Sequence, residues 1–75
     1  MDKTTASNTY SELNNDGMGF AIGEEDMTLA AAAESEGWTV DEVYEISLIR
    51  ATDSNGHTVL IGGDGMGRMA WAVRA

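Results

Sequence analysis

The chain has 75 residues, the length of one small domain, and it contains neither cysteine nor proline. Without cysteine it has no disulfide or thiolate metal site, and no apolar run reaches the roughly 20 residues of a membrane-spanning helix. The 13 acidic residues outnumber the 4 basic ones and give a formal net charge of −9, which argues against direct binding to nucleic-acid phosphates. These observations predict a cytoplasmic protein without a membrane segment.

The first residues of the chain are polar. We expect residues 1–9 to form a disordered N-terminal arm, because they lack a hydrophobic stretch that would order them or act as a secretory signal. A single acidic domain is then expected over residues 10–75.

The tetrapeptide Asp-Gly-Met-Gly occurs twice, at residues 16–19 and 64–67. A phosphate-binding loop would need a following Lys and Ser or Thr, which neither copy has, and the flanking residues do not indicate an internal repeat. Glycine supplies the positive φ angles that turns need. We therefore predict that each copy is a turn before a strand, the first leading into a short strand at residues 20–22.

The stretch GEEDMTLAAAAESEG, residues 23–37, has the composition of the main helix. Asp26 and Thr28 are both candidates for its N-cap, and Gly37 is placed to end it. The alanines of this segment allow close packing on a sheet. Trp38 follows directly and is expected to supply the buried bulk that the alanines lack.

A β-hairpin over residues 43–61 is the best-supported element. The period-two alternation of VYEISLI, residues 43–49, predicts one strand. Asn55–Gly56 is a strong signal for a hairpin turn, and HTVLI at residues 57–61 predicts the partner strand. Residues 39–42 also match a capping box, so a second helix starting there is an alternative, and the two helices would then form a helix-turn-helix. The acidic residues of that second helix would face DNA phosphates, which is the wrong sign of charge for DNA binding.

The last predicted strand is RMAWAVR, residues 68–74, in which Met69, Trp71 and Val73 alternate with small or basic residues. We expect Trp71 in the core. The fold class is then α+β: one main helix packed on a small antiparallel sheet of three to four strands, in the order short strand, helix, strand, strand, strand.

No group of residues in the sequence indicates catalysis. His57, the single histidine, lies beside the hairpin turn and is expected to be exposed. Asp53, Asn55 and Asp64 resemble positions of a calcium-binding loop, but Thr58 occupies the place of the required glycine. We expect no enzymatic activity, no cofactor and no metal site.

The negative charge is distributed unevenly. Residues 1–49 carry a formal charge of −10, residues 50–75 carry +1, and no basic residue lies between Lys3 and Arg50. We predict that acidic residues of this segment form a surface that binds a partner. The predicted residues are Asp16, Glu24, Glu25, Asp26, Glu34, Glu36, Asp41, Glu42 and Glu45.

Carboxylates held on a rigid domain can compete with nucleic acid for a cationic groove. B-DNA carries one charge per about 1.7 Å of axis, so a small domain of net charge −9 is in the range that one side of the duplex presents. In size and charge the chain resembles small phage-encoded inhibitors of bacterial defence, such as anti-CRISPR and anti-restriction proteins. The resemblance implies a non-enzymatic inhibitor that blocks the basic nucleic-acid-binding surface of a defence complex in the bacterial cytoplasm.

Two other interpretations stay open. A small interaction or regulatory module, including a homodimer, would use the alanine-rich helix or an open edge strand for its contact. An acidic surface with more arginine than lysine is also typical of salt-adapted proteins, in which charge maintains solubility. Salt-sensitive binding to a basic protein would favour the inhibitor. A molecular size that depends on concentration would favour the interaction module, and unfolding in dilute buffer would favour the salt-adapted protein.

Overall fold

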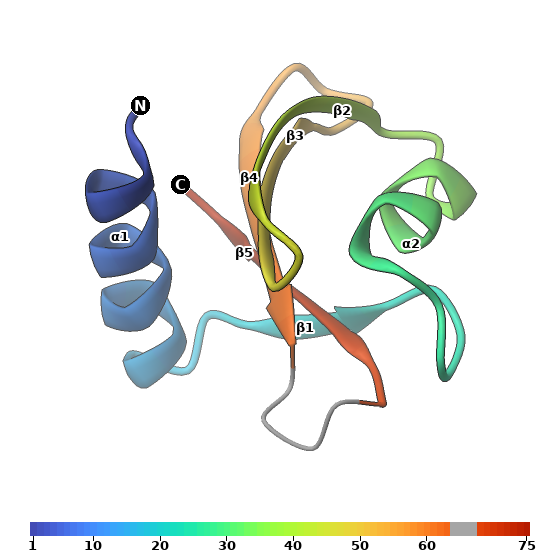
Figure 1. Cartoon of the computed structure of the whole chain (residues 1–75), viewed down its shortest axis with the longest axis horizontal. Helices are drawn as coiled ribbons and strands as arrows, with labels where there is room; N and C mark the ends of the chain where they lie inside the picture. The colour runs from blue at the N-terminus through green and yellow to red at the C-terminus, as the bar shows by residue number, and fades with distance from the viewer. Residues whose placement is uncertain (64–67) are drawn as a thin grey trace.

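The computed structural model describes residues 1–63 and 68–75, and in this part of the chain one antiparallel sheet lies between two helices (Figure 1). The sheet has five strands in the spatial order β1-β5-β4-β3-β2, so that β1 and β2 are its edges. The elements in chain order are α1 (Lys3–Asn15), β1 (Phe20–Ile22), α2 (Leu29–Ser35), β2 (Thr39–Glu45), β3 (Leu48–Thr52), β4 (Thr58–Gly63) and β5 (Ala70–Arg74).

Each face of the sheet is covered by one helix. Successive strand residues point to opposite faces, so the apolar strands present side chains to both helices. Leu48, Leu60 and Val73 pack with Ala6 of α1. The neighbouring strand residues turn to the other face and pack with α2. The cluster on that face contains Ile22, Ala32, Ala33, Trp38, Ile49, Ala51, Val59, Ile61, Ala70 and Ala72.

The expectation of a disordered arm over residues 1–9 is wrong, because most of this segment belongs to α1. The carboxylate of Asp2 caps the helix by accepting a hydrogen bond of 2.7 Å from the Thr5 N–H. Ala6 is fully buried, and Tyr10 and Leu13 pack against the same cluster. These three residues follow the i, i+4, i+7 spacing of one helical face, and the sheet supplies the apolar partner that makes the short polar helix stable.

A helix is confirmed within residues 23–37 as α2, but it has 7 residues and is not the main helix, because α1 has 13. The expected single helix and the order that starts with a strand are therefore wrong, since α1 precedes β1. Thr28 is the N-cap of α2 and accepts a hydrogen bond of 3.1 Å from the Ala31 N–H. Gly37 follows the helix with a φ of +79°. Glu24–Asp26 therefore lie in the loop before the helix and not in its first turn, where carboxylates would meet the positive end of the helix dipole.

The strand at residues 20–22 is confirmed as β1, and the strand expected over residues 68–74 is confirmed as β5 from Ala70 onwards. The hairpin turn at Asn55–Gly56 is confirmed between β3 and β4. The single strand expected over residues 43–49 is wrong. A turn at Ile46–Ser47 divides it between β2 and β3, so the sheet has five strands and not three to four.

The helix-turn-helix alternative is also wrong, because the capping-box residues 39–42 begin β2. Pairing with β3 places Val40 opposite Ala51 and lets it pack against the core on the α2 face. This burial outweighs the local capping signal, which is worth only about 1 kcal/mol.

The first Asp-Gly-Met-Gly copy is a turn before a strand, as predicted. Asp16 is the C-cap of α1, and Gly17 follows with a φ of +76°. The Met18 N–H then donates a hydrogen bond of 3.0 Å to the Leu13 carbonyl and directs the chain towards β1. The second copy, at residues 64–67, lies outside the described residues.

The two tryptophans differ in burial. Trp38 is buried as expected, and its ring meets the Phe20 ring edge to face at 6.2 Å between centroids. Trp71, which we expected in the core, is only partly buried. It lies against Gly19, where an added Cβ would be 1.8 Å from the indole Nε1, so this close approach requires glycine.

Candidate functional site

All nine acidic residues predicted to bind a partner are exposed, but the fold does not gather them into one surface. Asp16 lies at the end of α1, on the opposite face of the sheet from α2. The other eight form two groups. The α2 acidic surface consists of Glu24, Glu25, Asp26, Glu34 and Glu36, and the β2 acids are Asp41, Glu42 and Glu45.

The α2 acidic surface is held together by main-chain contacts of its loop. The Gly23 N–H donates a hydrogen bond of 3.2 Å to Glu36 Oε1, which brings the loop before α2 next to the end of the helix. The Asp26 N–H donates one of 2.7 Å to the Arg68 carbonyl, and Asp26 has a φ of +64°. The loop that carries the first three acids is thereby tied to α2 and to the segment before β5.

Within the described part of the chain, the carboxylates of the α2 acidic surface have no basic partner. Among residues 1–63 and 68–75, none of the five makes an ion pair. Glu34 lies in the last turn of α2 and Glu36 is its C-cap, at the end of the helix where the dipole is negative. Their placement therefore opposes the helix dipole, and it leaves the negative charge of this surface available to a partner.

The β2 acids are mostly engaged within the molecule. Glu45 Oε2 lies 2.7 Å from Lys3 Nζ, and Glu42 Oε2 lies 3.5 Å from an Arg50 guanidinium nitrogen. Hydrogen bonds from Lys3 and Ser47 lower the pKa of Glu45 below its usual value. The Thr52 hydroxyl donates a hydrogen bond of 2.6 Å to Asp41. This group therefore holds α1, β2 and β3 together, and its negative charge is partly neutralised.

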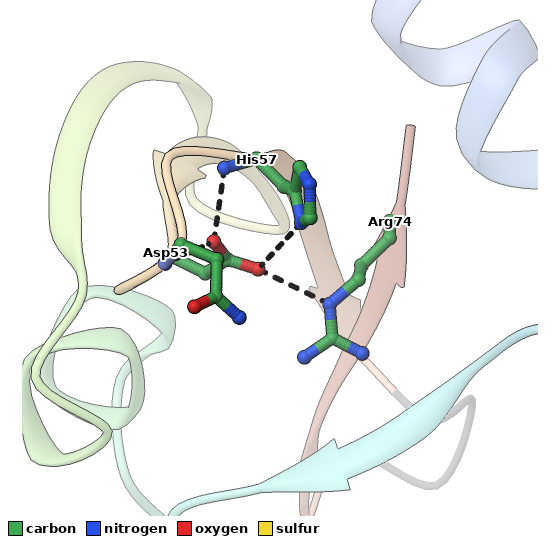
Figure 2. A network of polar contacts seen from close by, with 4 residues as sticks. Asp53, His57 and Arg74 are labelled. Atoms are coloured by element: carbon green, nitrogen blue, oxygen red, sulfur yellow. Dashed lines mark hydrogen bonds and ion pairs between the residues drawn. The ribbon is translucent and has the colours of Figure 1, made fainter.

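A polar network at the end of the sheet was not predicted from the sequence (Figure 2). The Asp53 side chain is only 2% exposed, at the start of the β3–β4 turn. Its Oδ1 accepts hydrogen bonds of 2.9 Å from the N–H groups of Asn55 and His57. Its Oδ2 accepts one of 3.1 Å from Arg74 Nε and lies 3.7 Å from His57 Nδ1.

The pKa of Asp53 is lowered by these contacts. The hydrogen bond from the His57 main chain contributes most, and those from Arg74 and Asn55 act in the same direction. Burial opposes them, because it disfavours the charged form. The His57 side chain is 64% exposed, as predicted for a turn residue. With both oxygens of Asp53 occupied by donors, the network stabilises the turn.

A local signal for part of this network was present in the sequence. Asp53 precedes Ser-Asn-Gly, and an aspartate at the start of a turn commonly accepts hydrogen bonds from the main chain two residues later. The contact with Arg74 had no such signal, because the two residues are 21 positions apart. Arg74 also lies over the Phe20 ring, with its guanidinium carbon 4.8 Å from the ring centroid.

No group of three His, Cys, Asp or Glu side chains in the described part of the chain is arranged to hold a metal ion. None of its helices is both long and apolar enough to cross a membrane. The exposed carboxylates of the α2 acidic surface can attract cationic groups.

Comparisons with protein-family models, with curated proteins and with solved structures give no match for this chain. The resemblance to phage-encoded inhibitors thus stays a prediction, and we argue the function from the residues of the chain itself.

Proposed function

We propose that the protein is a non-enzymatic inhibitor that binds the basic, nucleic-acid-binding surface of a bacterial defence complex through its α2 acidic surface. The observation that carries the proposal is the set of five exposed carboxylates without an ion pair in the described part of the chain. Exposed charges of one sign accelerate association with an oppositely charged partner and restrict the choice of partner.

The placement of Glu34 and Glu36 supports this interpretation. A carboxylate at the C-terminal end of a helix is unfavourable by about 0.3–1 kcal/mol, since it meets the negative end of the dipole. No basic residue in the last turn of α2 compensates for it. Residues that break a local rule of stability without local compensation are characteristic of functional surfaces.

The size of the molecule supports competition with nucleic acid. Its described part measures 27 × 25 × 21 Å. A length of 27 Å of B-DNA carries about 16 phosphate charges, of which about half lie on one side. The net charge of −9 is comparable with that number. A cationic groove at the α2 acidic surface meets five of the carboxylates, since Asp16 lies on the opposite face and two of the β2 acids are paired.

The proposal is tested by affinity capture from a nuclease-treated bacterial lysate with the intact chain as bait. A nucleic-acid-binding protein should be retained at about 0.1 M salt, released near 0.5 M, and displaced by added DNA. A partner that is indifferent to both salt and DNA would contradict the proposal. Concentration-dependent self-association as the only interaction would instead favour the interaction module.

A matched pair of variants assigns the interaction to a surface. Glu24→Lys with Glu25→Lys should weaken capture at least tenfold, whereas Glu12→Lys with Asp16→Lys makes the same charge change at the end of α1 and should weaken it much less. Asp26 is best left unchanged or replaced by asparagine, because its φ of +64° disfavours lysine. Equal losses in both pairs would mean that net charge, and not this surface, determines binding.

A further inference from the structure

The hairpin between β2 and β3 exposes two large aliphatic side chains. Ile46 is 95% exposed and Val43 is 60% exposed, whereas Ile49, Leu60 and Ile61 of the neighbouring strands are almost completely buried. Val43 lies in the edge strand β2, and Ile46 lies in the turn that follows it. Both side chains are thus available to a partner. Without a partner they remain exposed to water, which is unfavourable for apolar side chains.

Turn chemistry does not account for Ile46. The turn between Glu45 and Leu48 contains two residues, and neither Ile46 nor Ser47 has a positive φ. Turns without a positive φ accept most residue types, so the main-chain geometry does not require isoleucine at this position. A polar residue would serve this turn equally well, yet position 46 carries a large aliphatic side chain that is 95% exposed.

The hairpin is held in one conformation before any partner binds. Glu45 contacts Lys3 of α1 at 2.7 Å and accepts a hydrogen bond of 3.0 Å from the Ser47 hydroxyl. The Tyr44 hydroxyl donates a hydrogen bond of 3.1 Å to the Met1 carbonyl. Ile46 lies between Glu45 and Ser47 in the sequence, and these contacts hold both of its neighbours. The main chain on both sides of Ile46 is thereby held in place, so a partner that binds this hairpin has less main-chain entropy to remove.

Two features limit what can bind here. The register of β2 against β3 shifts twice, between Val40 and Glu42 and between Val43 and Glu45, and such bulges disfavour the addition of another strand to an edge. A second copy would bring its own net charge of −9 to the same surface. Charge complementarity therefore favours a basic partner over a homodimer.

We propose that Ile46 and Val43 are the apolar anchors of the interaction, and that they enter an apolar pocket bordered by lysine or arginine on a basic partner protein. This inference rests on the proposed function in one respect, the positive charge of the partner. It adds a second contact region, at the β2–β3 hairpin, and predicts that charge alone is insufficient for full affinity.

The test uses the intact chain and two short synthetic peptides of equal positive charge, one with alternating lysine and leucine and one with alternating lysine and serine. NMR titration of the ¹⁵N-labelled protein at about 0.1 M salt is expected to show tighter binding of the lysine–leucine peptide, with shifts concentrated at residues 43–47. Ile46→Ser should weaken that peptide about tenfold. Met18→Ser is the matched control, because Met18 is also exposed, at 58%, but lies beyond α1.

Equal binding of the two peptides, no binding of the lysine–leucine peptide, or equal effects of Ile46→Ser and Met18→Ser would overturn the inference. The Glu24→Lys, Glu25→Lys variant changes the α2 acidic surface and leaves Val43 and Ile46 in place, so it separates this result from the proposed function. Failure of the proposed function appears as a captured partner that DNA does not displace. Failure of the present inference appears as a lysine–leucine peptide that does not distinguish Ile46→Ser from the wild type.

Discussion

The Nε–H of Arg74 donates a hydrogen bond of 3.1 Å to Asp53 Oδ2, and this contact joins the last strand to the turn between β3 and β4. Arg74 also lies over the Phe20 ring, so one side chain connects the turn with both β5 and β1. The contact closes the end of the sheet at which the chain terminates.

We expect Asp53 to make stability depend on pH in the acid range. Its pKa in the folded protein lies below the usual value of 3.8, so the folded state binds fewer protons than the unfolded state. The stabilisation is fully present above the unfolded pKa and is lost as the pH falls through the folded pKa. Thermal unfolding of the wild type and of Asp53→Asn between pH 7 and pH 2 measures this effect.

The variant should have a lower midpoint temperature at pH 7 and a smaller decrease towards pH 2. Glu25→Gln is the control, because it removes one charge from an exposed side chain that makes no ion pair in the described part of the chain. Parallel pH profiles for Asp53→Asn and the wild type would show that the network does not contribute to acid sensitivity.

Replacement of Gly62 by alanine should weaken the packing of α1 on the sheet. A Cβ at this position would lie 2.8 Å from Tyr10 Cζ, so the ring of Tyr10 has to move. We expect a loss of about 1–3 kcal/mol in the free energy of unfolding, measured by urea denaturation. Gly63→Ala is the matched control, since a Cβ there meets no atom within 4 Å. Equal losses in the two variants would exclude the Tyr10 contact as the cause.

Removal of the N-cap of α2 should destabilise the protein. In Thr28→Ala the Ala31 N–H loses its hydrogen bond to the Thr28 hydroxyl, and we expect a cost of about 1 kcal/mol. Thr28→Ser retains a hydroxyl and should remain close to the wild type. Urea denaturation of the three proteins checks this expectation, and a serine variant as unstable as the alanine variant would contradict it.

The charge of Glu34 should reduce stability while it serves binding. Glu34→Lys replaces a carboxylate near the negative end of the α2 dipole by a cation, and we expect the free energy of unfolding to rise by about 0.3–1 kcal/mol at low salt. The gain should shrink in about 0.5 M salt because of screening. In the capture experiment the same variant should bind more weakly. A destabilised variant would contradict the electrostatic account of this helix end.

The acidic surface was predicted only in part. The excess of carboxylates between Lys3 and Arg50 is a property of the sequence, and their exposure follows from the cost of burying charge. Their division is a property of the fold. The sheet separates Asp16 from the α2 acidic surface, and Lys3 and Arg50 pair with two of the β2 acids.

Local signals in the sequence were enough to predict α2 and the turn between β3 and β4, although they left Asp26 and Thr28 as alternative N-caps. Thr28 and Gly37 delimit α2, and Asn55–Gly56 forms the turn between β3 and β4, because capping and turn geometry depend on adjacent main-chain groups. The excess of acidic residues, and thus the sign of the charge that a partner meets, is likewise readable without a fold.

The role of the first residues and the network at Asp53 depend on contacts between segments that are distant in the sequence. Ala6 and Tyr10 become core residues only when the sheet presents Leu48, Leu60 and Val73 to α1. Arg74 reaches Asp53 only because β5 pairs with β4 and brings the end of the chain beside the turn. Both contacts join segments that are distant in sequence, and burial of apolar surface by the assembled sheet is the force that brings them together.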